Sequence, residues 1–244
     1  MSNYKNPTPG KFPILAKSLC SVHKRPTKSC YQLLAECGFS MGTESYFATD
    51  VITRSLKNAE DTGVKFNIAS SALRNNEQTC AAVVNQFKNN PNLGMWNFVD
   101  EPYVDDFKHL SELVKVIRNN DPNHMVYINL SATPKQSEEK LWTGNSYNAY
   151  LDLVEEYFSP SVWSYDLYPF KIKNGIAEFD SRFYPFLEIF STRAKNTGRP
   201  FWAYCLSTRF KTGSIECIPT ESHIRFEAFS ALAYGAQGLV YWTY

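Results

Sequence analysis

Carboxylates follow two apolar, strand-like runs in the chain. Leu93 to Val99 (LGMWNFV) is followed directly by Asp100 and Glu101, and Val162 to Leu167 carries Asp166 near its end. Two carboxyl groups can divide acid and base work, because one acid protonates a leaving oxygen while the other carboxylate attacks or activates water. Cleavage of a glycosidic bond needs this equipment, so these acids are the first candidates for chemistry.

The sequence offers little support for metal-dependent, Ser-His-Asp or redox catalysis. No H-x-H or H-E-x-x-H spacing occurs, so a metal-dependent hydrolase lacks its usual ligands. No G-x-S-x-G occurs either, and the four histidines fall in predicted loops, helices or strand starts. The six cysteines include no C-x-x-C pair, which disfavours a zinc or redox site. We therefore expect neither a metal nor a cofactor.

Composition excludes some partners and favours another. The formal net charge is +1 with no basic stripe, so binding to nucleic acid is not expected. No stretch of eighteen apolar residues occurs, and we expect no membrane span. Residues 1–10 are polar and Pro-rich without an apolar signal core; a trimmed secreted or periplasmic chain would look the same. Aromatic residues reach 15%; most must fill the core, but rings also stack on sugar faces, so a carbohydrate is the expected ligand.

Strand-like and helix-like segments alternate along the whole chain. The expected strands are 12–19, 39–45, 64–69, 93–99, 124–130, 162–167, 200–206 and 238–242. The expected helices are 27–37, 50–62, 77–88, 104–119, 147–157, 179–196 and 221–234. Such alternation implies parallel strands with right-handed crossovers.

The number of units and the length favour a closed barrel over an open sheet. The chain has 244 residues, close to the roughly 250 of a (β/α)8 barrel. A doubly wound open sheet usually has a glycine-rich turn after its first strand, whereas residues 20–26 (CSVHKRP) contain no glycine. We predict one (β/α)8 barrel domain over residues 1–244, with the eighth helix absent.

Barrel enzymes place their catalytic residues at the carboxyl ends of the strands. Glu101 is the candidate general acid, with Asp166 or Glu44 as the second carboxylate. Each of them has a plainer alternative as a structural ion pair or a loop anchor. The candidate substrate-binding residues share a position at a strand end or on a long loop: Asn97, Asp100, Asn129, Trp142, Tyr168, Tyr204 and Trp242.

Three segments carry a resemblance to a known group of enzymes. Trp96 to Pro102 (WNFVDEP) resembles the fourth-strand motif of clan A glycoside hydrolases, in which Asn-Glu-Pro holds the acid/base glutamate. Ser164 to Pro169 and Arg225 to Trp242 resemble the sixth strand and the closing helix and strand of β-galactosidase-like barrels. The resemblance implies that Glu101 is the acid/base and that Trp242 contributes a ring to a sugar subsite.

The seventh strand departs from that pattern. Clan A enzymes carry their nucleophilic glutamate at its end, but Phe201 to Ser207 (FWAYCLS) contains no carboxylate. Asp166, Glu44 or a loop residue, Glu216, could replace it. The alternative is a barrel that binds a glycan without cutting it. An unrelated barrel lyase or isomerase receives little support without a phosphate-binding glycine loop.

Overall fold

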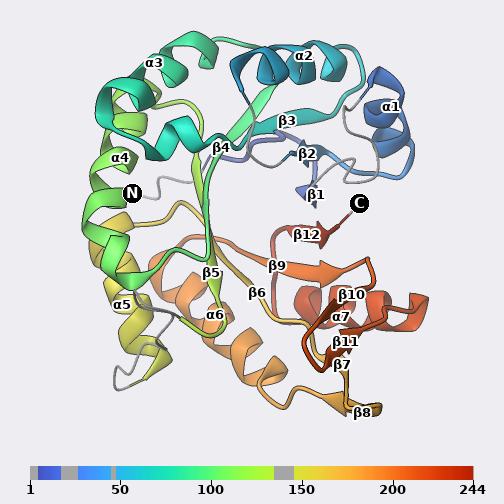
Figure 1. Cartoon of the computed structure of the whole chain (residues 1–244). Helices are drawn as coiled ribbons and strands as arrows, with labels where there is room; N and C mark the ends of the chain where they lie inside the picture. Colours follow the sequence, from blue (N-terminus) through green and yellow to red (C-terminus); the bar gives the residue numbers. More distant parts are fainter. Residues whose placement is uncertain (1–4, 18–26, 45–47, 135–145, 244) are drawn as a thin grey trace.

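A closed barrel of eight parallel strands forms the centre of the molecule (Figure 1). The computed structural model describes residues 5–17, 27–44, 48–134 and 146–243. Around the barrel the strand order is β1 (Ile14–Lys17), β12 (Leu239–Trp242), β9 (Phe201–Leu206), β6 (Trp163–Asp166), β5 (Val126–Ser131), β4 (Leu93–Asp100), β3 (Lys65–Ile68) and β2 (Met41–Thr43). The first and last strands pair directly, with Ile14 opposite Leu239, and this pairing closes the barrel.

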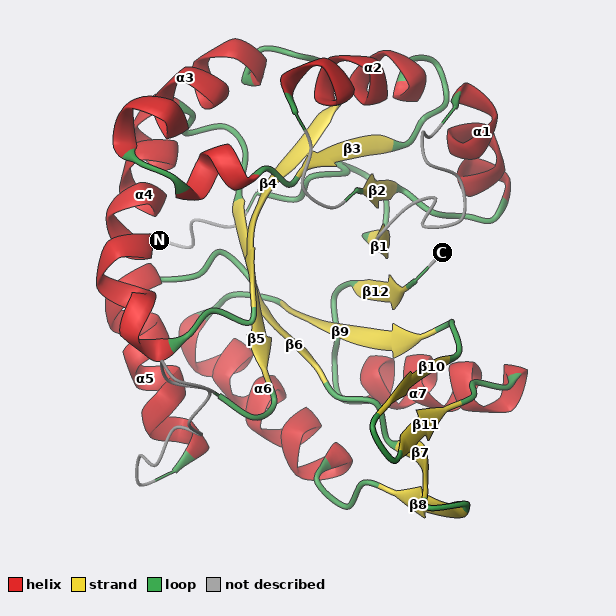
Figure 2. Cartoon of the chain, in the orientation of Figure 1, coloured by secondary structure: helices red, strands yellow, loops and turns green. Residues whose placement is uncertain are grey.

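Within the described residues, seven α-helices surround the strands (Figure 2). They are α1 (Lys28–Glu36), α2 (Thr49–Ala59), α3 (Glu77–Phe87), α4 (Phe107–Asn120), α5 (Tyr147–Phe158), α6 (Phe183–Thr197) and α7 (Glu221–Ala233), with 3-10 turns η1 (Ser71–Arg74) and η2 (Val104–Asp106). The predicted (β/α)8 barrel is confirmed, and the described part of the chain contains no eighth helix. None of the described helices is long and apolar enough to cross a membrane.

Side-chain alternation along the strands gives the barrel two apolar cores. One core lies between strands and helices and holds residues of both, such as Trp96 and Leu113. The other contains strand and strand-flanking residues and fills the barrel, with Met95, Tyr127 and Trp202 among its members. Gly238 makes room for this second core, because a Cβ there would lie 2.6 Å from the indole nitrogen of Trp202.

A small antiparallel sheet lies at the end of the barrel where β6 and β9 finish (Figure 1). It consists of two hairpins, β7 (Phe170–Lys173) with β8 (Ile176–Phe179) and β10 (Phe210–Thr212) with β11 (Ile215–Cys217). The predicted helix over 179–196 was wrong at its start, because β8 extends to Phe179 and α6 begins only at Phe183. This sheet was not predicted from the sequence.

The first hairpin turns at Asn174-Gly175. Both residues have positive φ, 50° and 80°, as a two-residue type I′ turn requires. Asn and Gly tolerate this conformation better than other residues do, so the dipeptide specifies the turn. Through this turn the chain that follows β6 returns towards α6, and the hairpin becomes a wall beside the strand ends.

Candidate active site

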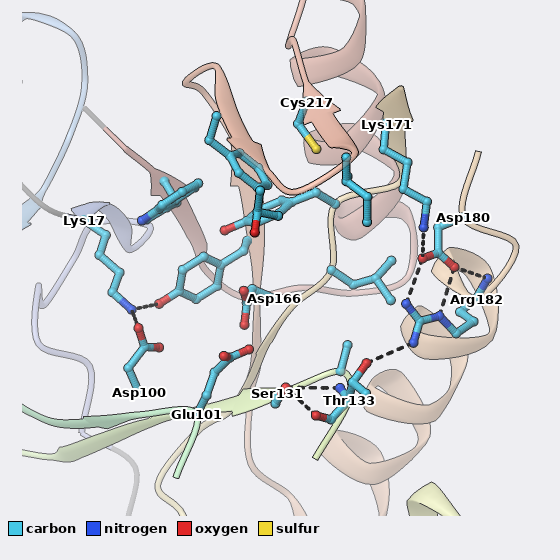
Figure 3. Close-up of a pocket in the computed structure, with 18 residues that line it drawn as sticks. Lys17, Asp100, Glu101, Ser131, Thr133, Asp166, Lys171, Asp180, Arg182 and Cys217 are labelled. Carbon is cyan, nitrogen blue, oxygen red and sulfur yellow. Dashed lines mark hydrogen bonds and ion pairs between the residues drawn. The ribbon is translucent and has the colours of Figure 1, made fainter. Parts of the chain in front are cut away.

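A cleft of about 540 Å³ opens at the carboxyl ends of the barrel strands (Figure 3). This is the end at which barrel enzymes build their sites. The walls come both from barrel strands and from the small sheet. The residues that line the cleft include Lys17, Asp100, Glu101, Thr133, Asp166, Tyr168, Lys171, Asp180, Arg182, Tyr204, Phe210 and Trp242.

Glu101 lies directly after β4 and its carboxyl points into the cleft towards Asp166 (Figure 3). Its backbone is left-handed, with φ 46°, and its N–H donates to the carbonyl of Asn129 at 2.9 Å. A non-glycine residue in this region carries strain, which clusters at functional sites. Within the described residues the Glu101 carboxyl makes no hydrogen bond or ion pair, so it is available to a ligand.

Asp100, the last residue of β4, is held from two sides. Its Oδ2 lies 2.6 Å from Nζ of Lys17, and its Oδ1 accepts a hydrogen bond of 3.0 Å from Nδ2 of Asn129. Lys17 also donates to the hydroxyl of Tyr204 at 2.9 Å. Asp100 is therefore fixed as a partner of Lys17 and Asn129, while the carboxyl of its neighbour Glu101 has no such partner among the described residues.

Asp166 ends β6 and shares Asn129 with Asp100. The second N–H of the Asn129 amide donates to Oδ1 of Asp166 at 2.8 Å, and the amide oxygen accepts from the hydroxyl of Ser164 at 3.0 Å. Burial, and then the nearby charges of Glu101 and Asp100, raises the pKa of Asp166 to about 7. This group of carboxyls therefore retains a proton close to neutral pH.

An aromatic wall faces these acids. The rings of Tyr168 and Trp242 are nearly parallel, with centroids 5.9 Å apart and an interplanar angle of 19°. Phe210 packs edge-on against Trp242 at 5.1 Å. The peptide bond between Trp242 and Thr243 is cis. Tyr168 and Trp242 were among the predicted binding residues, whereas Phe210 was missed because it lies on the unpredicted sheet.

The opposite end of the cleft is built from Lys171, Asp180 and Arg182 (Figure 3). Oδ2 of Asp180 accepts from Nζ of Lys171 at 3.1 Å and from Nη2 of Arg182 at 2.8 Å. The hydrogen bonds from Arg182 hold the pKa of Asp180 well below its usual range. This cluster was not predicted from the sequence. The signal that could have placed it is Asn174-Gly175, which predicts a hairpin turn between two short segments of alternating residues.

The structure does not bring Glu44 or Glu216 together with Glu101. The Glu44 side chain, in a residue only 1% exposed, accepts from the hydroxyls of Tyr31 and Ser55, both at 3.2 Å, on α1 and α2. Burial raises its pKa to about 7, but it does not line the cleft. Glu216 pairs with Arg209, on the face of β11 opposite to its cleft-lining neighbours.

The remaining predicted binding residues differ in their positions. Tyr204 lines the cleft and Asn129 supports it from below, as described. Asn97 is buried in the barrel, where its Nδ2 donates to Oγ1 of Thr43 at 3.2 Å, and it does not line the cleft. Trp142 lies outside the described residues.

One buried acid behind β9 was not predicted. Glu227 on α7 is 2% exposed, and its Oε2 accepts a hydrogen bond of 2.7 Å from the backbone N–H of Leu206. Burial raises its pKa to about 8. Glu227 does not line the cleft, and nothing in its sequence context distinguishes it from an exposed helical glutamate.

The described residues contain no cluster of three or more His, Cys, Asp or Glu that could hold a metal ion. Asp100 and Asp166 are instead engaged with Lys17 and Asn129. The donors and acceptors present can bind hydroxyl groups, and the carboxyls can transfer protons.

Comparison with known proteins supports the barrel fold only. No family model matches the sequence, and no protein of curated function matches it. A β-galactosidase from Marinomonas ef1 superposes with a TM-score of 0.65 at 9% identity, over 95% of this chain and 54% of that one. Xylanase 10B from Thermotoga maritima gives 0.57 at 11% identity, over 96% and 83%.

The same barrel also occurs in an enzyme of another class. An HpcH/HpaI aldolase from Desulfitobacterium hafniense gives a TM-score of 0.55 at 9% identity, over 95% of this chain and 86% of that one. Identities this low show a shared fold and no more. The chain therefore has the (β/α)8 barrel fold of proteins that include several glycoside hydrolases.

Proposed function

We propose that this protein is a glycoside hydrolase that acts on an oligo- or polysaccharide, with Glu101 as general acid/base and Asp166 as the second carboxylate. One observation carries the proposal. In a single open cleft, the unengaged carboxyl of Glu101 points towards Asp166, whose pKa is raised to about 7. Two carboxyls that retain one proton near neutrality can supply an acid and a base together.

The roles follow from how each carboxyl is held. Glu101 is free to approach a glycosidic oxygen and to give it the proton that the pair retains as the C–O bond breaks, so the pair reacts with this proton on Glu101 and with Asp166 ionised. Asp166 is fixed by Asn129 and, once ionised, can attack the anomeric carbon or take a proton from the attacking water. The anomeric configuration of the product, read by NMR, distinguishes these two routes.

The rest of the cleft suits a sugar ligand. Tyr168, Phe210 and Trp242 present ring faces and edges on which the C–H face of a sugar can stack. Asp100, Lys17 and the hydroxyl of Tyr204 offer acceptors and donors for sugar hydroxyls at the other side. Fixed polar groups beside an apolar wall are typical of small-molecule sites.

The test is Glu101→Gln, which keeps the size of the side chain and removes its proton transfer. We expect turnover of glycosides with poor leaving groups to fall by about a thousandfold, and turnover of nitrophenyl glycosides to fall much less, because their leaving group needs little protonation. Glu216→Gln, the same change on the far face of β11, is the matched control. Wild-type turnover in Glu101→Gln on poor leaving groups would falsify the assignment.

A second candidate function follows from the end of β9. The strand carries no carboxylate where clan A enzymes have their nucleophile, which favours a barrel that binds glycans without cutting them. In that case glycans bind equally to the wild type and to Glu101→Gln, and the wild type releases no new reducing ends. The release of reducing ends from any bound glycan would exclude this alternative.

A further inference from the structure

Two cations surround one carboxylate at the end of the cleft that lies away from Lys17 (Figure 3). The Asp180 side chain is only 8% exposed, whereas those of Lys171 and Arg182 are 24% and 48% exposed. The carboxylate of Asp180 is therefore buried, whereas the side chains of Lys171 and Arg182 are partly exposed at the surface of the cleft. With two positive charges and one negative charge, this cation cluster presents net positive charge to the cleft.

The guanidinium of Arg182 is held in place before any ligand arrives. Its Nε and Nη2 donate to Asp180 at 3.0 and 2.8 Å, and its Nη1 donates to Oγ1 of Thr133 at 3.2 Å. Arg182 immediately precedes α6, and its backbone N–H also donates to Oδ1 of Asp180 at 3.1 Å. An anion that binds here pays little to order these groups.

The charges of the cleft are unevenly distributed. Three carboxyls, those of Asp100, Glu101 and Asp166, lie on one side together with Lys17, and the cation cluster lies on the other (Figure 3). A negatively charged ligand group is repelled from the acids and attracted to the cations, so a ligand with one acidic group enters in one orientation. A neutral glycan gains nothing from this arrangement.

We propose that the cation cluster is a subsite for an acidic sugar, whose carboxylate or sulfate group binds Lys171 and Arg182 while a neighbouring glycosidic oxygen lies at Glu101. The guanidinium of Arg182 has five N–H groups, of which three donate to Asp180 and Thr133, so one N–H on each of Nη1 and Nη2 remains for two oxygens of either oxyanion. This proposal names the substrate class of the proposed hydrolase and rests on that function. A purely structural ion cluster would show no preference for acidic ligands.

The experiment measures binding by calorimetry to the full chain carrying Glu101→Gln, so that the ligand is not consumed. Oligogalacturonate and glucuronoxylan oligosaccharides are each compared with their carboxyl-reduced, neutral counterparts, and a sulfated oligosaccharide with its desulfated form. We expect the acidic member of at least one pair to bind about 10- to 100-fold more tightly, with a preference that shrinks as salt is added. The pair that responds identifies carboxylate or sulfate.

Charge-removing variants test whether the preference arises from the cation cluster. Lys171→Gln leaves the pairing of Arg182 with Asp180 intact, so it keeps the test valid even if Arg182→Gln fails to fold. We expect either variant to remove most of the preference and Arg182→Lys to retain part of it. Lys211→Gln is the matched control, because Lys211 is exposed on β10 between two cleft-lining residues and faces the other way.

The outcomes separate this proposal from the proposed function. Equal affinity for both members of every pair overturns the proposed acidic subsite. So does an equal loss of the preference for the acidic ligand in Lys171→Gln and Lys211→Gln. Cleavage of a neutral member by the wild type would still support the hydrolase. Failure of every glycan both to bind Glu101→Gln and to be cleaved by the wild type would count against the two proposals together.

Discussion

Two carboxyl groups in this barrel, those of Asp166 and Glu227, have similarly raised pKa values but differ in their access to the cleft. Burial is the largest cause of a raised pKa for Asp166 at the end of β6, to about 7, and for Glu227 behind β9, to about 8. Asp166 faces an open cleft and the charges of Glu101 and Asp100. Glu227 is enclosed between α7 and β9 and accepts the N–H of Leu206.

The difference shows that a raised pKa reports desolvation and that chemistry also needs access. Glu44, with a pKa of about 7, belongs with Glu227, because hydroxyls of two helices occupy its oxygens. Perturbed carboxyls concentrate at functional sites, but structural ones are perturbed by the same burial. Only Asp166, of these three, combines the shift with a position on the cleft.

Neutralising Asp166, Glu44 and Glu227 one at a time is expected to give the largest difference between these carboxyls. We expect Asp166→Asn to lower kcat about a thousandfold, because the second carboxylate of the pair is lost. Glu44→Gln and Glu227→Gln should keep kcat within several-fold of the wild type, since neither group reaches the cleft. The measurement is steady-state hydrolysis, with thermal melting to confirm the fold of each variant.

If Glu227→Gln lost as much activity as Asp166→Asn while remaining folded, access would not be the deciding difference. The end of β9 would then contribute to the reaction through Glu227 after all. If Asp166→Asn kept wild-type turnover, the second carboxylate would have to come from elsewhere.

The aromatic wall gives a similar contrast between two tryptophans. Trp242 lines the cleft, so Trp242→Ala should raise KM about 10-fold through the loss of sugar stacking, with little change in melting temperature. Trp202 fills the barrel, so Trp202→Phe should lower the melting temperature and leave KM nearly unchanged in the folded protein. A KM unchanged in Trp242→Ala would remove this ring from the binding site.

Asn129 offers a way to shift the pKa of Asp166 without touching a carboxyl. Its amide donates to Asp166 and Asp100 and stabilises their charged forms. In Asn129→Leu the charged form of Asp166 loses this support, so its pKa rises further. The pair is active only while it keeps one proton, so loss of that proton sets the alkaline limb of the kcat/KM profile near pH 7 in the wild type. We expect this limb to move to higher pH by about one unit in Asn129→Leu.

The matched control is Asn97→Leu, another barrel asparagine, which bonds to Thr43 and does not contact the acids. Its alkaline limb should stay in place. A shift to lower pH in Asn129→Leu, or equal shifts in both variants, would show that the limb reports a group other than Asp166.

The architecture could be predicted from sequence because its signals are local and repeated. Apolar runs and amphipathic segments alternate often enough to count eight strands and seven helices, and the barrel rule then places Asp100, Glu101 and Asp166 at one end. The same rule places Glu44 at that end, but its carboxyl does not line the cleft. Glu44 lies one residue beyond β2, so strand alternation no longer fixes its direction, and its carboxyl turns to the helices.

Features that depend on long-range packing could not be predicted in this way. Glu227 is buried because α7 lies against β9, which no local pattern around it reveals. The small sheet was predictable in principle from Asn174-Gly175, but its strands of three or four residues were absorbed into long loops and a helix. Phe210, Lys171 and Arg182 were missed with it. The part of the cleft that they line was therefore not predicted from the sequence.

The smallest effect on turnover, and a distinct effect on stability, is expected for Glu227→Gln. In the wild type the folded state holds the Glu227 proton up to about pH 8, whereas the unfolded chain releases it near its ordinary value of 4.5. Between these values the folded state binds more protons, so the free energy of unfolding falls as pH rises. Glu44 and Asp166 add slopes of the same sign.

Glutamine is neutral at every pH and can still accept the N–H of Leu206. Glu227→Gln should therefore lose about 3 to 4 kcal/mol less stability than the wild type between about pH 5 and pH 8. Urea denaturation at both pH values measures the difference, and Glu216→Gln, at an exposed ion pair, is the control that should leave the slope unchanged. Identical slopes in Glu227→Gln and the wild type would mean that Glu227 is solvated, and the contrast with Asp166 would then rest on position alone.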